Sequence, residues 1–192
     1  MRNPVDHPVH DLFATRWSPY AFDPERSVDT GTLTSLFEAA RWAMSSYNAQ
    51  PWRYVVANRA SDEAMWERVL SVLVEGNRAW ARHAPVLALG LFQPAFERNG
   101  KSNAAARHDL GAASAFLTLE ATARGLAVHQ MIGIEPARAK ERFGLPDSLE
   151  PLTALAIGYA GANPALDEKL AERDRRERTR EPLSEIIVRG AL

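Results

Sequence analysis

A helix, a polar loop and a strand are predicted in direct succession between residues 33 and 56, and this stretch constrains the fold more than any other part of the sequence. The helix is predicted by apolar residues that recur at helical spacing on one face. These residues are Leu33, Leu36, Phe37, Ala40 and Met44. Asp29 or Thr30 can cap its start. The strand follows at 52–58, where aromatic and β-branched residues are concentrated.

The loop between these two elements, from Ser45 to Pro51, is rich in hydroxyl and amide side chains. Short polar residues and proline are common turn formers. A polar loop held between two rigid elements is a frequent place for ligand binding. The composition fits an ordinary helix-to-strand connection equally well.

The string AARWAMSSYNAQPWRY at 39–54 resembles the signature of the nitroreductase family, the flavin mononucleotide (FMN) dependent reductases. The usual form of that signature is Ala-Arg-x-Ala-Pro-Ser-Ser-x-Asn-x-Gln-Pro-Trp. The matching residues are Ala40, Arg41, Ala43, Ser45, Ser46, Asn48, Gln50, Pro51 and Trp52, while Met44 replaces the usual proline. The resemblance implies that the flavin lies beside the polar side chains of this loop. They are Ser45, Ser46, Asn48 and Gln50.

A second motif lies near the N-terminus, in the stretch Arg16-Trp17-Ser18-Pro19-Tyr20-Ala21-Phe22. A guanidinium, a hydroxyl and nearby backbone N–H groups can hold a phosphate, whereas the alternative is a surface arginine beside a packed tryptophan. The stretch is similar to the family's phosphate motif, Arg-x-Ser-x-basic-x-Phe. Tyr20 takes the third position, which is usually Arg or Lys. The resemblance implies that Arg16, Trp17, Ser18 and Tyr20 belong to the cofactor site.

The C-terminal run DEKLAERDRRERTRE mixes both signs of charge, a pattern that usually marks a solvated face. The family, however, ends with a basic-x-basic pair before a proline and a last strand. Arg178, Arg180, Pro182 and the apolar residues 186–188 match that pattern. The resemblance therefore implies that Arg178 and Arg180 join Arg16 at the flavin phosphate, and that a strand near 186–189 is exchanged between subunits.

Two further segments resemble flavin-contacting parts of the family. Asn77 precedes an apolar run, as a flavin-contacting asparagine does in the family, although helix capping or a turn is an alternative role. The run GLAVHQMIG resembles the segment whose backbone lies against the flavin ring, which implies a cofactor site at Met131, Ile132 and Gly133. A plain turn glycine is the alternative for Gly133.

The remaining patterns predict an α+β fold of one domain, residues 1–192, with a central sheet of four or five strands flanked by helices. Strands are predicted near 52–58, 85–92, 126–131, 152–159 and 186–189, and helices at 9–16, 61–75, 110–124, from 136 and from 163. The helix at 110–124 is apolar nearly all round, which predicts burial on every side. In a domain this small, a second subunit is a natural way to cover it. The resemblance implies a nitroreductase-like, mainly antiparallel sheet in an intertwined homodimer with two FMN sites at its interface. A loop at 93–107 is expected over the mouth of the site.

Composition excludes several classes of function. A net charge of −1 gives no electrostatic case for binding nucleic acid or an anionic membrane. The absence of cysteine removes disulfides and thiolate metal sites, and fits a reducing, cytoplasmic location. No apolar run approaches the roughly 20 residues that span a bilayer. His7 and His10 are too few for a predicted metal site. No Gly-x-Gly-x-x-Gly turn follows a predicted strand, so no Rossmann site is expected.

The resemblance implies a two-electron reduction by a ping-pong cycle. NADH or NADPH gives a hydride to the flavin, and a small electron-poor acceptor such as a nitroaromatic or a quinone then takes it. Because the cofactor performs the redox chemistry, no side chain is assigned as catalytic. Two alternatives stay open: a protein that senses or stores FMN without turnover, and a reductase or oxidase dedicated to one metabolite. Tyr20 and Met44, which depart from the family pattern, keep the first alternative open.

Overall fold

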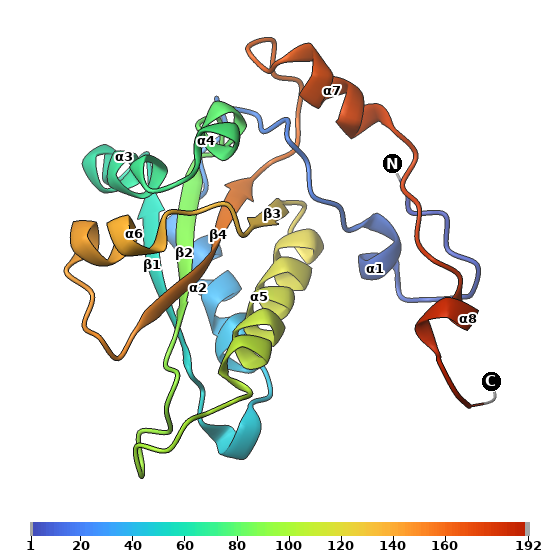
Figure 1. Ribbon diagram of the computed structural model, residues 1–192. Helices are drawn as coiled ribbons and strands as arrows, with labels where there is room; N and C mark the ends of the chain where they lie inside the picture. The colour runs from blue at the N-terminus through green and yellow to red at the C-terminus, as the bar shows by residue number, and fades with distance from the viewer. Residues whose placement is uncertain (1, 191–192) are drawn as a thin grey trace.

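The computed structural model, which describes residues 2–190, contains a four-stranded antiparallel sheet at its centre (Figure 1). Its strands are β1 (Trp52–Asn58), β2 (Val86–Phe92), β3 (Ala127–Met131) and β4 (Glu150–Gly158). Their order in the sheet is β1-β2-β4-β3, so that β1 and β3 form the two edges. Four of the predicted strands are therefore confirmed, each within two residues at either end.

Helices cover both faces of this sheet. They are α1 (Asp11–Thr15), α2 (Thr30–Arg41), the 3₁₀ turn η1 (Ser46–Asn48), α3 (Glu63–Ser71), α4 (Glu75–Ala81), α5 (Ala106–Ala123), α6 (Pro136–Phe143), α7 (Glu168–Arg175) and α8 (Leu183–Ile186). One face packs against α2 and α5, and the other packs against α3, α4 and α6 (Figure 1). Within residues 2–190, no helix combines the length and the apolar composition needed to cross a membrane.

The strand β2 shows why an apolar run without polar alternation forms the middle of the sheet. Leu87 and Leu89 point into the layer that contains α3 and α6, whereas Val86 and Ala88 point into the layer that contains α2 and α5. Every residue of β2 is buried, because both faces of a central strand are covered here.

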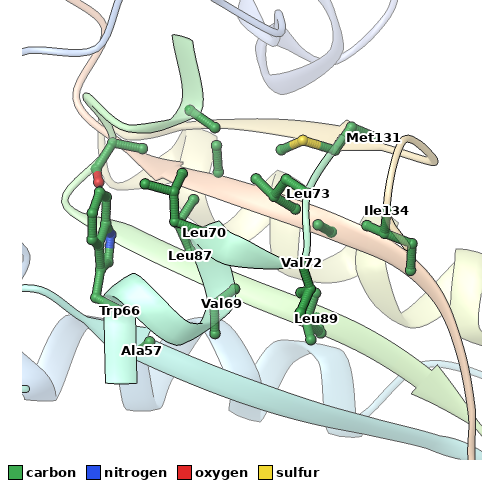
Figure 2. Packing of buried hydrophobic residues seen from close by; sticks show 14 of the residues in the cluster. Ala57, Trp66, Val69, Leu70, Val72, Leu73, Leu87, Leu89, Met131 and Ile134 are labelled. Carbon is green, nitrogen blue, oxygen red and sulfur yellow. The ribbon is translucent and has the colours of Figure 1, made fainter. Parts of the chain in front are cut away.

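The layer on the α3 side is built largely from aliphatic residues, together with Phe22, Trp66 and Trp80, and Figure 2 shows part of it. Val69 and Leu70 of α3 pack over Leu87 and Leu89 of β2, and Trp66 closes one end of the cluster. The Trp66 indole N–H donates to the Ala84 carbonyl oxygen at 3.2 Å. Its polar atom is thus satisfied within an apolar layer.

Helix boundaries follow local capping, with some corrections to the sequence-based bounds. Asp29 caps α2 by accepting from the Thr32 N–H at 2.9 Å, as one of the two predicted candidates. The helix predicted at 61–75 begins only at Glu63, because Asp62 rather than Ser61 caps it. It ends at Ser71, and a separate helix, α4, follows. The helix expected from residue 163 likewise begins later, after the cap Asp167.

The burial predicted for the helix at 110–124 is only partly achieved within the single chain. Leu110, Ala113 and Leu117 of α5 are buried against the sheet and α2. Gly111 and Ala115 of the same helix are exposed. Burial of this remaining face against a second subunit, which the sequence analysis expects, stays a prediction.

The predicted strand at 186–189 does not form within the single chain, and its pairing with a partner's sheet stays a prediction. The segment instead forms the short helix α8, followed by irregular backbone, and residues 181–190 are exposed. Figure 1 shows this orange-to-red segment running beside the N-terminal residues, away from the sheet. A strand requires the backbone of a neighbouring strand, and the position of the segment provides none within the described residues.

Candidate functional site

Three arginines from the two ends of the chain line one small cavity. Arg16, Arg178 and Arg180 surround a volume of about 260 Å³, together with Asn3 and Phe13. Burial of Arg16, followed by the positive charges of Arg180 and Arg178, lowers its pKa from the usual value. Guanidinium groups repel one another, so a cavity that gathers three of them favours an anionic ligand. The structure thus brings together the three arginines that the sequence analysis assigned to a phosphate.

Side-chain hydrogen bonds tie these arginines to the N-terminal segment. Nε of Arg178 donates to Oδ1 of Asn3 at 2.6 Å, and Nδ2 of Asn3 donates to the carbonyl oxygen of Arg16 at 3.0 Å. The Arg178 guanidinium lies 5.4 Å from the centre of the Trp17 ring. A guanidinium nitrogen of Arg16 donates to Oγ of Ser18 at 3.2 Å. Trp17 and Ser18 therefore contact the arginine cluster, and their place in a cofactor site stays a prediction.

Tyr20, the residue that departs from the family motif, packs in an aromatic cluster. Its ring centre lies 5.2 Å from that of Trp80 and 4.8 Å from that of His129. Its backbone N–H lies 3.0 and 2.9 Å from the two carboxylate oxygens of Asp174, and the Ala21 N–H donates to the second oxygen at 2.8 Å. The helix α7, which carries Asp174, is thereby fastened to the Tyr20 backbone.

His129 of β3 connects the same N-terminal segment to the sheet. Its Nδ1 lies 2.9 Å from the Pro19 carbonyl oxygen. Because a carbonyl can only accept, Nδ1 carries the hydrogen and donates it. Burial lowers the pKa of His129, so the ring is neutral at pH 7. This bond holds the residues that follow Arg16 and Ser18 against the edge strand of the sheet.

The segment after β3 packs against α4 at very short range. The Gly133 carbonyl oxygen accepts from the Val74 N–H at 3.1 Å and from Nδ2 of Asn77 at 2.9 Å. A Cβ atom at Gly133 would lie 2.3 Å from Nδ2 of Asn77 and 2.8 Å from Cγ2 of Val74. Close approach, rather than a positive φ, is therefore what requires glycine at this position. The Asn77 side chain holds the segment in place, a role different from the capping alternative.

Met131 and Ile132, the two residues before Gly133, differ in how far their side chains are exposed. Met131 is buried, and its carbonyl oxygen accepts from Oγ1 of Thr153 at 2.9 Å. Ile132 is 74% exposed. The backbone of this segment is thus fixed from one side by β4 and α4, while the Ile132 side chain projects from the surface.

The loop from Ser45 to Pro51 carries unusual backbone geometry. Among residues 2–190, the non-glycine residues with positive φ are Tyr47 at 52°, Asn48 at 53° and Gln50 at 46°. Such conformations cost on the order of 1–3 kcal/mol each and persist only where the surroundings hold them. Strain concentrated in one polar loop favours a functional site over the ordinary connection that composition also allowed.

Hydrogen bonds at both ends hold this strained loop. Oγ of Ser45 accepts from the Gln50 N–H at 3.0 Å. The Ser46 N–H donates to Oδ2 of Asp109 at 3.0 Å. Asp109 is 3% exposed and also lies 3.2 Å from Nδ1 of His108. Its carboxylate lies in the first turn of α5, where the helix dipole favours negative charge. Asp109 therefore positions the loop.

The sequence-predicted site residues fall into two groups within the chain. The loop at 45–50 leads into β1, whereas Met131 ends β3 and Gly133 follows it, at the opposite edge of the sheet. These edge strands are three strand spacings apart, or about 14 Å. Figure 1 shows η1 beside the N-terminal end of α5, and α4 and β3 at the other end of the molecule. The arginine cavity belongs with the second group, since His129 of β3 bonds to Pro19.

Sequence analysis did not single out Asn3, His129 or Asp174. Each acts through a partner far away in the chain, at separations of 175, 110 and 154 residues. No local pattern in a single sequence reports contacts over such separations.

Comparisons with known proteins give one consistent result. A sequence description of the nitroreductase family matches residues 13–159. A solved structure described as an oxidoreductase containing FMN is 33% identical, has a TM-score of 0.90, and the match covers 98% of this chain and 95% of that one. A nitroreductase family protein from Clostridium difficile 630 is 26% identical, with a TM-score of 0.73 and coverage of 97% and 100%. A Streptomyces coelicolor protein, provisionally named NADH dehydrogenase/NAD(P)H nitroreductase, is 28% identical over 81% of this chain and 85% of its own length. Motifs, fold and relatives agree, and this chain belongs to the nitroreductase family.

Proposed function

We propose that this protein is an oxidoreductase that binds FMN and passes a hydride from NADH or NADPH to a small electron-poor acceptor, such as a nitroaromatic or a quinone. The observation that carries the proposal is the cavity lined by Arg16, Arg178 and Arg180. An FMN-containing structure with a TM-score of 0.90 and a relative named as an NAD(P)H nitroreductase support it.

The residues present fit the phosphate end of FMN. That phosphate is a dianion, and three guanidinium groups supply charge-assisted donors around one cavity, with the Ser18 hydroxyl beside Arg16. The pKa of Arg16 is already lowered by burial and by its two neighbours. An anion between the three groups removes the repulsion between them. When bound, FMN supplies the two-electron chemistry, accepting a hydride from NAD(P)H and giving it to the acceptor.

The chain's own residues would bind and orient the flavin ring. The backbone at 131–133 is fixed by Thr153 and Asn77, and the missing side chain at Gly133 permits close packing. His129 holds its proton at Nδ1, in the bond to Pro19, and so maintains the N-terminal segment rather than donating to a substrate. Protons for the reduction come from water, because the proposal assigns no side chain as a general acid.

A second copy of the chain would complete each site. The polar loop at 45–50 lies apart from the arginine cavity within one chain. The exposed face of α5 carries small residues such as Gly111 and Ala115, which allow close helix packing. Ile186 and Val188 are 60% and 87% exposed and would be covered by a partner. We propose a homodimer in which Ser45, Ser46, Asn48 and Gln50 of one chain face the cavity of the other.

The absorption spectrum of the purified protein tests the proposal. We expect flavin bands that bleach when NADPH is added under nitrogen and return when menadione or nitrobenzene follows. Colourless protein that takes up no FMN in equilibrium dialysis would contradict the proposal. Bound flavin that NADPH and NADH both fail to bleach would favour the alternative of a protein that stores or senses FMN.

A further inference from the structure

A second cavity lies between the strained loop and the connection from β2 to α5. Its volume is about 430 Å³, within the range of pockets that take small organic ligands. It is lined by Tyr47, Asn48, Ala49, Pro51, Gln93, Ala95, Phe96, Glu97 and Arg98. The Gln93 N–H donates to the Pro51 carbonyl oxygen at 2.9 Å, and a bridge between Ala95 and Ser102 closes the connection. Both walls are thereby joined.

Two aromatic rings form the apolar part of this cavity. The ring centres of Tyr47 and Phe96 lie 5.9 Å apart, with an angle of 84° between the planes. Tyr47 is 78% exposed although its backbone is held at a φ of 52°. A strained loop that presents a large aromatic side chain to solvent offers a packing surface, and the preferred partner of such a surface is another planar ring.

The charge at this cavity comes from an arginine that rests on both rings. The Arg98 guanidinium carbon lies 4.7 Å from the Tyr47 ring centre and 5.2 Å from that of Phe96. When a guanidinium stacks on aromatic faces, its in-plane N–H groups remain available to donate hydrogen bonds to an anion. The connection carries Arg98 and Lys101 against one carboxylate, Glu97, and Arg107 follows in the first turn of α5. It is thus positively charged in a chain whose net charge is −1.

We infer that this cavity binds the electron acceptor and selects planar aromatic compounds that carry a carboxylate. The inference rests on the proposed function, because Asn48, which lines the cavity, is also one of the residues proposed to contact FMN. An aromatic ring packs on Tyr47 and Phe96 while its carboxylate meets Arg98. For a nitrobenzoate, the nitro group takes up two electrons and two protons, loses one oxygen as water and becomes a nitroso group. NAD(P)H supplies one hydride, and the second proton comes from solvent.

Equilibrium binding of two matched probes to the oxidised holoenzyme tests the inference. The probes are 4-nitrobenzoate and 4-nitrobenzyl alcohol, which share shape and differ in charge. Calorimetric titration, or the change in flavin absorption, gives both dissociation constants without turnover. We expect the wild type to bind the carboxylate about tenfold more tightly, and Arg98→Gln to remove this preference while still binding the alcohol. Arg98→Lys should keep part of the preference.

Three further variants separate charge from packing. Arg138→Gln changes an exposed arginine on α6 and should leave both constants unchanged. Glu97→Gln removes the carboxylate from the cavity and should tighten binding of 4-nitrobenzoate alone. Tyr47→Ala should weaken the binding of both probes to a similar degree.

Failure of the inference can be told apart from failure of the proposed function. FMN content and bleaching by NADPH, measured on the same samples, report on the proposed function. If the flavin bleaches but the wild type binds both probes equally, or Arg98→Gln leaves their ratio unchanged, the inference is overturned while the proposed function stands. Failure of the wild type to bind either probe overturns the inference as well.

Discussion

A methyl group added at Gly133 should strain the contact between the segment after β3 and helix α4. The new Cβ would lie 2.3 Å from Nδ2 of Asn77 and 2.8 Å from Cγ2 of Val74. The amide must therefore move, and its 2.9 Å bond to the Gly133 carbonyl is lost. Overpacking typically costs about 1–3 kcal/mol and a lost hydrogen bond about 0.5–1.5 kcal/mol. We expect Gly133→Ala to lower the free energy of unfolding by about 2–4 kcal/mol.

Urea unfolding of the apoprotein, followed by circular dichroism, measures this loss. Gly76→Ala is the matched control, because a Cβ there meets nothing within 4 Å, and it should not destabilise the protein. In an Asn77→Ala background the clashing amide is gone. There, Gly133→Ala should lower the free energy of unfolding by about 1 kcal/mol less than it does in the wild type. A Gly133→Ala protein as stable as the wild type, or a cost that is the same in both backgrounds, would refute the reasoning.

Three other substitutions test the contacts around the arginine cavity, and one truncation tests the proposed dimer. Asp174→Asn weakens the acceptor for the Tyr20 and Ala21 N–H groups and should cost up to about 1.5–3 kcal/mol, measured by urea unfolding; an unchanged midpoint would contradict the role. Arg180→Ala should raise the dissociation constant of FMN by about 10- to 150-fold in a flavin fluorescence titration, whereas equal affinity would remove Arg180 from the phosphate site. Burial lowers the folded pKa of His129, so the unfolded chain takes up a proton first as the pH falls through about 6.5. Stability should therefore fall between pH 7.5 and 5.5, and His129→Gln should reduce that fall; an identical slope in the variant would exclude His129 as its source. Truncation after Pro182 should give aggregates or flavin-free monomers by light scattering, and a folded, yellow monomer would reject the dimer.

Most of the sheet could be predicted from the sequence because local patterns carry it. The residues of β2 are apolar without alternation, and burial on both faces produces that pattern. The helix α2 follows from apolar spacing and from the Asp29 cap. The arginine cavity was predictable only through family resemblance, since Arg16 and Arg178 are far apart in sequence and no local period connects them.

Contacts between distant segments could not be predicted. Asn3 and Asp174 look like ordinary polar residues in the sequence, yet each joins segments more than 150 residues apart. The segment at 186–189 has the composition of a strand but forms no ladder in one chain. The apolar composition of α5 predicts burial, but it does not report which faces of the helix are covered within the same molecule.

The bond between Asn3 and Arg178 has a consequence for how the ends of the chain behave. Both ends of the chain line the cavity that gathers the arginines. An anion bound there therefore holds the two ends together, and fraying of either end opens the cavity. The same opening step then releases the ligand and exposes both ends to proteases. An anion at 100 times its dissociation constant would favour the closed form by about 2.7 kcal/mol. Saturating ligand should thus slow cleavage near residue 5 and near residue 180 together and by the same factor.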